Sequence, residues 1–374
     1  MSVAIAGVDP LVVSGWAAVS PLGMDDAAFA EGVLAVTSGV RPVEQGLGVP
    51  QQRAALIADF DQRTALGRKG TRSMDRVTGL AVHVVGRLLS MAPRNVVTGE
   101  GYDVGLVLGT GTGSVRSMME FTQSSLEGAK PYDVDPARFP NTVMNCAAGQ
   151  CAIWYGLRGP NTTVAGGQVT GLLAMRYAAR LLRNGHASTV LCGAAEEFST
   201  QRSWLEWHAT AGDHAPLGEG AAIFLLEPAT VAAASGRQPL ADLVAMEFGV
   251  ANDETDVTTV LARCVLRALR GCGASPAAIW AYAPGPYDAR RADLAVSVPG
   301  TPRHRSNPAE LVGDTGAVSA AFQLAAVLAL AERDAPPRGA LALITSIDRD
   351  GLVGAALFGL RDPGPQTPRK AVVR

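Results

Sequence analysis

Residues 159–171 read GPNTTVAGGQVTG. The run passes from a turn through a short β-branched stretch to small residues, and the apolar, helix-periodic residues 172–182 follow it. This order predicts a strand, a sharp elbow and a helix, with the side chain of residue 168 presented on the elbow. A cysteine would suit that position, because a helix N-terminus favours the negative charge of a thiolate. Gln168 can neither ionise nor form a thioester, so the pattern lacks its nucleophile.

The composition indicates an α/β protein. Of the 374 residues, 48% are hydrophobic but only 5% are aromatic, and 42 are glycine. We therefore expect a core of small aliphatic side chains with closely approaching backbones. The net charge of −2 argues against binding to nucleic acid. We find neither a signal-peptide pattern nor an apolar run of membrane-spanning length, so we expect a cytoplasmic protein with no membrane segment.

The cysteines indicate a reduced chain rather than a disulfide framework or a metal centre. They are odd in number, and none forms a close pair with metal-ligand spacing; they are Cys146, Cys151, Cys192, Cys264 and Cys272. We predict no metal and no cofactor.

Alternating strand and helix patterns run through the chain twice. The first half, residues 1–230, contains the elbow and a glycine turn, GTGTGS, at residues 109–114. The second half, residues 231–365, repeats the rhythm in weaker form, which suggests an internal duplication. Residues 366–374 are predicted to be a flexible tail. In the first half we expect helices at 75–89, 115–126 and 172–184 and strands at 103–108, 189–192 and 221–227. In the second half we expect helices at 257–270 and 316–332 and strands at 279–283, 341–345 and 355–360.

Seven segments, taken together and in order, resemble the β-ketoacyl synthase branch of the thiolase fold. No single one would suffice, because a glycine turn alone is a weak motif. The segments are VSPLG at 19–23, SMDR at 73–76, GTGTGS at 109–114, FPNTVMN at 139–145, GPN at 159–161, GAAEE at 193–197 and PLGEGAA at 216–222. The resemblance implies a thiolase-like α/β fold, with duplicated halves forming a five-layered αβαβα sandwich.

The same resemblance implies that the condensing chemistry has been lost. Active synthases carry an acyl group on the elbow cysteine, and two histidines assist the decarboxylation of the extender unit. Here Gln168 aligns with the cysteine, Pro284 with the first histidine and Asp314 with the second. No catalytic residue is expected to be intact.

A glutamine at the elbow is a feature of the chain length factor, the ketosynthase-like β subunit of type II polyketide synthases, and this chain resembles such subunits. The resemblance implies a heterodimer with an active ketosynthase. An acyl carrier protein would deliver the growing chain to this complex, mainly to the ketosynthase. It also implies that the helix after the glycine turn lines a tunnel for the growing chain. The matching tunnel positions are Val115, Met118 and Thr122, with Met119 and Phe121 nearby. Spacing alone would make Met118 and Phe121 ordinary core residues.

By the same resemblance, segment 139–145 would lie at the dimer interface, beside the entrance to the partner's active site. The residues concerned are Phe139, Asn141, Thr142 and Met144.

Other interpretations stay open from the sequence. Gln168 could simply cap the helix that it opens. The chain could be a stand-alone decarboxylase or acyltransferase that uses Gln168 and Asp314, or a purely structural homodimer. Cys146 or Cys151 could supply a displaced nucleophile, although free cysteines in alanine-rich surroundings are usually core residues.

Overall fold

The computed structural model describes residues 9–92, 96, 101–212, 215–253, 255–289 and 301–361. Its centre is a 10-stranded sheet with the order β11-β10-β12-β13-β9-β1-β8-β6-β4-β5. The predicted flexible tail at residues 366–374 lies outside the described residues.

The sheet consists of two groups of strands with the same arrangement. In the first group, β5, β4 and β6 run parallel, while β8 is antiparallel to β6 and β1 to β8. In the second, β11, β10 and β12 run parallel, while β13 is antiparallel to β12 and β9 to β13. A short ladder between β1 and β9 joins the groups. The strands are β1 (Leu11–Val19), β4 (Val104–Gly109), β5 (Asn161–Val164), β6 (Thr189–Glu196), β8 (Gly220–Pro228), β9 (Ala241–Val250), β10 (Ile279–Ala283), β11 (His304–Arg305), β12 (Leu341–Ile347) and β13 (Leu352–Leu360).

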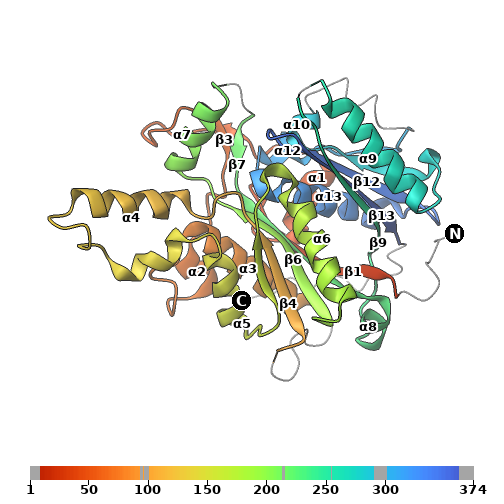
Figure 1. Cartoon of the computed structure of the whole chain (residues 1–374), viewed down its shortest axis with the longest axis horizontal. Helices are drawn as coiled ribbons and strands as arrows, with labels where there is room; N and C mark the ends of the chain where they lie inside the picture. The colour runs from red at the N-terminus through yellow and green to blue at the C-terminus, as the bar shows by residue number, and fades with distance from the viewer. Residues whose placement is uncertain are drawn as a thin grey trace.

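Helices cover both outer faces of the sheet and fill the space between its halves (Figure 1). The inner pair is α6 (Thr170–Arg183) and α13 (Ser319–Asp334). On one outer face lie α3 (Arg76–Met91) and α5 (Cys146–Tyr155), and on the other lies α9 (Val257–Gly271). The resulting order, helix, sheet, helix, sheet, helix, confirms the predicted five-layered αβαβα architecture.

Strand β6 shows why these strands can lie inside the protein. Residues along a strand alternate between its two faces. Val190 and Cys192 pack into the cluster around the inner helices, whereas Leu191 and Ala195 pack against the cluster that contains α3 and α5. Both faces are apolar, so the strand is buried along its whole length.

One helix in the described part of the chain is long and apolar enough to cross a membrane, namely residues Gly316–Asp334. Its most apolar window is 83% buried, because α13 packs at the centre of the fold. The burial of its whole apolar surface identifies it as a core helix.

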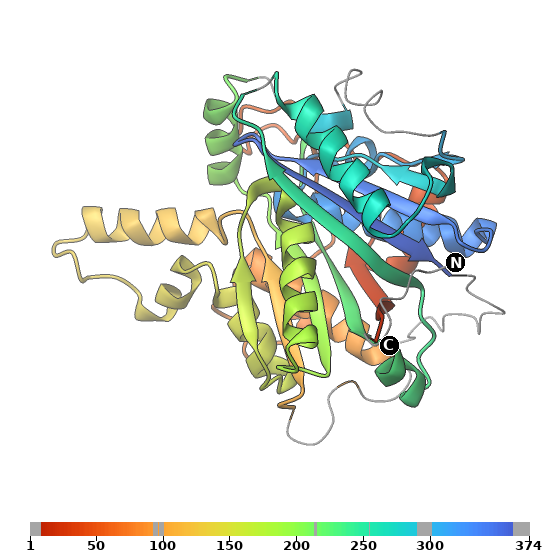
Figure 2. The same cartoon turned by 45° about the vertical axis from the view of Figure 1, so that its right-hand side comes forward.

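Helix α4 (Val115–Glu127) departs from the layers. Together with the 3-10 helix η1 (Pro136–Thr142) it forms an arm that projects from the body of the protein, as both views show (Figures 1 and 2). Further short helices lie around the sheet: α1 (Asp26–Leu34), α2 (Gln62–Leu66), α7 (Thr200–Ala209), α8 (Ala229–Ala234), α10 (Pro286–Ala289) and α12 (Pro308–Val312).

Candidate functional site

The elbow at Gln168 forms where the sequence predicts it. Strand β5 ends at Val164, and the 3-10 turn Gly167–Val169 leads into α6. Gly167 has φ +56, and a Cβ there would lie 1.7 Å from Oδ1 of Asp348. Only glycine fits that position, because any side chain would be strained and would collide with the carboxylate. The turn therefore holds residue 168 in a fixed place.

Three hydrogen bonds fix Gln168 itself. Its backbone N–H donates to Oδ1 of Asp348 at 3.0 Å, and its carbonyl accepts from Oγ of Ser346 at 3.0 Å. Its side-chain Nε2 donates to Oδ2 of Asp314 at 2.9 Å. Helix α6 receives no side-chain cap hydrogen bond, so the capping interpretation of Gln168 is wrong. The amide nitrogen of Gln168 is engaged with an acidic side chain of the same chain.

Asp314 is held as firmly as Gln168. It follows Gly313, which has φ +72, and its Oδ1 accepts from the N–H of Gly316 at 2.9 Å. Its backbone donates to the carbonyl of Pro216 at 2.7 Å and accepts from the N–H of Gly218 at 2.8 Å. The carboxylate has a neutral amide and a backbone N–H as partners. Neither contact provides the proton transfer that a histidine would perform.

Pro284 lies where β10 ends and borders a small internal cavity. The cavity measures about 10 Å³ and is also lined by Gly313, Thr315, Phe322 and Gln323, among others. That volume is about the minimum for one water molecule. Gln323 closes one side by donating to the carbonyls of Ala283 and Thr345 at 2.5 and 2.8 Å.

The two cysteines considered as displaced nucleophiles lie on α5. Cys151 is fully buried, and burial raises the pKa of its thiol far above the usual value. Burial, assisted by the negative charge of Asp75, raises the pKa of the Cys146 thiol to about 11. Reactive cysteines have lowered pKa values. Both residues are therefore thiols at neutral pH, which argues against this interpretation.

The arm presents most of the residues predicted for a tunnel. Among the 13 residues of α4, all of them described, only Val115 is buried. Met118 and Met119 are 43% and 44% exposed, and Thr122 is also exposed. Phe121 contacts Phe139 with ring centroids 5.9 Å apart. The helix thus leaves its methionines facing solvent, so core burial does not explain them.

The residues predicted for an interface lie on or beside η1. Phe139 is 58% exposed, and Met144 and its neighbour Val143 are exposed as well. Asn141 donates to the carbonyl of Ser73 at 2.5 Å, and the Thr142 hydroxyl donates to the carbonyl of Phe139 at 2.8 Å. Asn141 therefore ties the segment to the body and Thr142 closes a turn within it, while the apolar residues remain uncovered.

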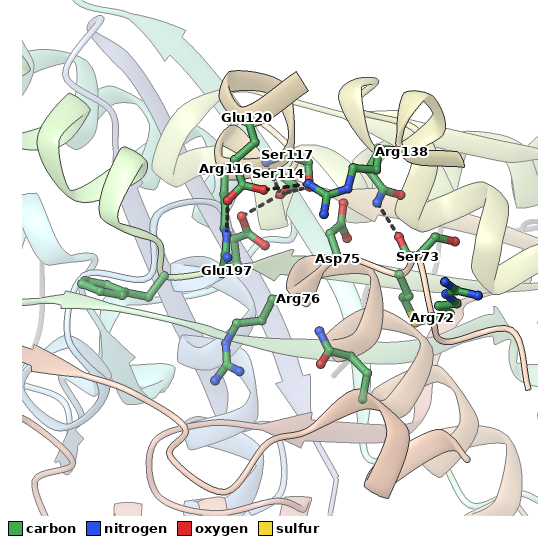
Figure 3. Close-up of a pocket in the computed structure, with 14 residues that line it drawn as sticks. Arg72, Ser73, Asp75, Arg76, Ser114, Arg116, Ser117, Glu120, Arg138 and Glu197 are labelled. Atoms are coloured by element: carbon green, nitrogen blue, oxygen red, sulfur yellow. Dashed lines mark hydrogen bonds and ion pairs between the residues drawn. The ribbon is translucent and has the colours of Figure 1, made fainter. Parts of the chain in front are cut away.

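A polar pocket of about 350 Å³ opens at the foot of the arm (Figure 3). Its walls come from four segments: residues 72–76, the cap and first turns of α4, η1, and the two residues after β6; Gln62 also lines it. Glu197 lies in its wall and accepts from Oγ of Ser114 at 2.8 Å and from the N–H of Val77 at 3.0 Å. Burial, followed by the nearby charge of Asp75, raises the pKa of Glu197 from 4.5 to about 7. Arg76 belongs to the same pocket but pairs with Glu219 at 2.7 Å.

A family model described as "Beta-ketoacyl synthase, N-terminal domain" matches residues 8–216. That is more than half of the 374-residue chain. The chain belongs to the β-ketoacyl synthase family.

Individual relatives of known function agree with this placement. The 3-oxoacyl-(acyl-carrier-protein) synthase 2 of Vibrio harveyi is 28% identical over 271 residues, which cover 67% of this chain and 64% of the relative. The corresponding synthase of Coxiella burnetii is 26% identical over 294 residues, covering 71% of this chain and 70% of the relative. The chain thus spans just under two thirds of the first relative's length.

Solved structures give a more complete match. The ishigamide ketosynthase/chain length factor superposes with a TM-score of 0.86 at 42% identity, covering 94% of this chain and 99% of the other. A ketosynthase and acyl carrier protein complex, AntDE:AntF, superposes with a TM-score of 0.78 at 17% identity and covers 94% of this chain and 100% of the other. The second match shows the fold alone. The predicted resemblance to ketosynthases and chain length factors is confirmed.

Two of the three positions that align with the family's cysteine and histidines are in direct contact in the structure. Gln168 and Asp314 share a hydrogen bond although 146 residues separate them. Pro284 borders the cavity that Gly313 and Thr315, the neighbours of Asp314, also line. The described residues contain no group of three or more His, Cys, Asp or Glu side chains that could hold a metal ion.

Neither the pocket nor a role for Glu197 was predicted from the sequence. A signal was present, because GAAEE ends a buried strand with two successive acidic residues. Buried carboxylates need hydrogen-bond donors, and here the donors come from helix N-termini that are distant in sequence.

Proposed function

We propose that this chain is a chain length factor of a type II polyketide synthase. It would pair with an active ketosynthase, line the polyketide tunnel at their interface and set the length of the product. The observation that carries the proposal is the hydrogen bond between Gln168 and Asp314. It occupies the two positions where the family's cysteine and second histidine align, so this chain has no condensing site of its own.

The rival decarboxylase or acyltransferase is less well supported. Such an enzyme would need the Gln168 amide to stabilise charge on a substrate carbonyl. The amide nitrogen instead donates to Asp314, and the carboxylate would repel a developing oxyanion. The buried Oε1 of Gln168, which has no hydrogen-bond partner among the described residues, can only accept a hydrogen bond.

The proposed pairing surface lies around the arm and the edge of the sheet. Monomeric proteins rarely leave large apolar side chains exposed in one contiguous region. Here exposed apolar side chains occur on α4, η1 and α5 and just after η1: Met118, Met119, Phe139, Val143, Met144 and Ile153. Strand β5 lies at the end of the sheet order, beside α5. A second subunit that covers this region would bury an apolar surface typical of permanent complexes.

The proposed tunnel positions are the exposed ones of α4, namely Met118, Met119 and Thr122. Methionine side chains are flexible and unbranched, so Met118 and Met119 would line a narrow but adaptable channel. Bulk at these positions would limit how far a chain could extend. The carrier protein would reach this channel through the ketosynthase subunit. A carrier protein bound to a ketosynthase is present in AntDE:AntF.

Co-expression tests the pairing. The chain is produced together with a type II polyketide ketosynthase that carries the full Cys-His-His set, and an affinity tag is placed on one subunit only. We expect a stable one-to-one complex that makes polyketide, whereas the tagged chain alone makes none. A soluble homodimer that ignores the co-expressed ketosynthase would contradict the proposal and favour the structural interpretation.

A further inference from the structure

Helix α4 is attached to the body at its N-terminal end, by contact with α7, and through η1, which Asn141 ties to Ser73. Only Val115 of its residues is buried, so core packing contributes little to its direction. The Phe121–Phe139 contact joins the helix to η1, which is itself part of the arm. The turn that precedes α4 is therefore one of the attachments that determine where the helix points.

Two successive carboxylates hold that turn. Glu196 is the last residue of β6, and Glu197 follows it directly. Oε2 of Glu196 accepts from the N–H of Gly111 at 2.8 Å. Oε1 of Glu197 accepts from Oγ of Ser114, three residues further along, at 2.8 Å. Both ends of the turn are thus tied to the central sheet.

Glu197 has the more specific contact with the helix. Ser114 is the N-cap of α4, and its Oγ also accepts from the N–H of Ser117 at 3.2 Å. The second carboxyl oxygen of Glu197 accepts from the N–H of Val77 in the first turn of α3 at 3.0 Å. Glu197 is only 2% exposed. Hydrogen bonds to a buried carboxyl group are stronger than hydrogen bonds to a carboxyl group exposed to water.

We propose that Glu197 is a positioning residue for α4: by holding the Ser114 cap against the end of β6 and the start of α3, it sets the direction of the helix and hence the length of the product. The step from direction to length rests on the proposed function. Thr122 lies eight residues beyond Ser114, about 12 Å along the helix axis, so a tilt of about 5° would move it by about 1 Å. A displacement of that size is a substantial part of the width of one methylene group, so it would change the space available to the chain.

Two substitutions of similar size separate hydrogen bonding from packing. Glu197→Leu fills the same space but offers no acceptor to Val77 or Ser114. Glu197→Gln can accept from Val77 with its oxygen and donate to the Ser114 hydroxyl with its nitrogen. A side chain that matters only for its volume would tolerate both replacements equally.

The test measures hydrogen exchange of the amides of α4 in the purified full-length chain, with any partner that co-purifies. We expect exchange to accelerate about tenfold in Glu197→Leu, because a strong hydrogen bond at the cap is lost, and to remain near the wild-type rate in Glu197→Gln. Amides of α6 serve as the internal reference. Equal exchange in wild type and Glu197→Leu would overturn the proposal.

A second pair of variants keeps the test decisive if Glu197→Leu does not fold. Ser114→Asp retains a good N-cap but places a carboxylate against Glu197, whereas Ser114→Thr keeps the hydroxyl. We expect faster α4 exchange in the first variant and wild-type exchange in the second. Unchanged exchange in Ser114→Asp would overturn the proposal in the same way.

The product spectrum of the assembled pair completes the experiment, with Met118→Trp measured in parallel. If both Met118→Trp and Glu197→Leu change the product length and Glu197→Gln does not, the inference is supported. If Met118→Trp changes the length but Glu197→Leu does not, the positioning role fails and the proposed function stands. If Met118→Trp has no effect while α4 exchange still responds to Glu197→Leu, the proposed function fails and the role of Glu197 in holding the helix stands.

Discussion

The elbow and the arm of this protein differ in hydrogen bonding, in burial and in the exposure of apolar side chains. At the elbow, backbone and side-chain hydrogen bonds fix Gln168, and the cavity beside Pro284 measures about 10 Å³. On the arm, α4 buries only Val115 and exposes Met118 and Met119. The region that carries the chemistry in active synthases is held here by hydrogen bonds within the chain, although Oε1 of Gln168 has no partner among the described residues. The region that a neighbouring subunit could cover is apolar and open.

This difference indicates where function can reside. A filled interior with a glutamine and aspartate pair can support the fold but cannot carry an acyl group. An exposed apolar surface costs solubility unless it binds something. We infer that the chain has kept the scaffold of the synthase while its functional role has moved from the elbow to the arm.

The largest expected effect is on pairing. Replacing Phe139, the exposed ring on η1, with aspartate would bury a charge in the proposed interface. We expect the affinity for the ketosynthase subunit to fall about 100-fold or more, which corresponds to about 3 kcal/mol or more. Quantitative pull-down or calorimetry measures it. Val250→Asp, at an exposed apolar position on β9, is the matched control and should leave affinity unchanged. Equal losses in the two variants would remove η1 from the interface.

The next effect concerns pH. The pKa of Glu197 is raised from 4.5 to about 7 in the folded protein, first by burial and then by Asp75. The folded state therefore holds the proton more tightly than the unfolded state. The contribution of this group to stability is full below about pH 4.5, is lost as the pH rises towards 7, and changes little above that.

Glu197→Gln cannot ionise, so it should not show this loss. We expect the stability difference between the variant and the wild type to grow in the variant's favour by up to about 3 kcal/mol across that window. Thermal or urea unfolding at several pH values measures the difference. A difference that stays constant with pH would show that folding does not raise the pKa of Glu197.

A smaller effect is expected at the elbow. Gln168→Leu removes the donor to Asp314, but it also removes the buried Oε1 that has no partner among the described residues. The two changes partly offset, so we expect the free energy of unfolding to fall by about 1 kcal/mol. Urea unfolding provides the value. In the double variant with Asp314→Asn the loss should be less than the sum of the single losses, and strict additivity would argue against the pair.

The smallest effect is expected from the surface ion pairs of the arm. Arg116 pairs with Glu120 at 2.7 Å, and both side chains are substantially exposed. Glu120→Ala should therefore change stability by less than about 1 kcal/mol, and only at low salt. A larger loss would mean that these charges, rather than the Ser114 cap, hold α4.

The elements that carry strong local patterns could be predicted from sequence. Glycines and a β-branched run mark the elbow, and apolar periodicity marks α3, α6 and α9, whose observed bounds differ from the predicted ones by only one or two residues. Strand β9, Ala241–Val250, was missed because its residues are mostly half-buried and its sequence lacks a clean alternation. Helix α7, Thr200–Ala209, was missed because its polar sequence buries only Arg202 and Ser203.

The site was only partly predictable, because its contacts join distant segments. Alignment to the family placed Gln168 and Asp314 at equivalent catalytic positions, but only folding shows that one donates to the other. The role of Glu197 depends on Ser114 and Val77, which lie 83 and 120 residues away. The local sequence shows that an acidic residue follows a buried strand, but it cannot predict which residues donate hydrogen bonds to it.

The central claim is that α4 of this chain sets product length in a partner's tunnel. It is tested most directly by the polyketides that the co-purified pair makes with Met118→Trp, compared with Met118→Leu as a control of similar volume to methionine. We predict that the tryptophan variant assembles normally and makes shorter products, while the leucine variant matches the wild type. An unchanged product spectrum from a fully assembled Met118→Trp pair would contradict the claim.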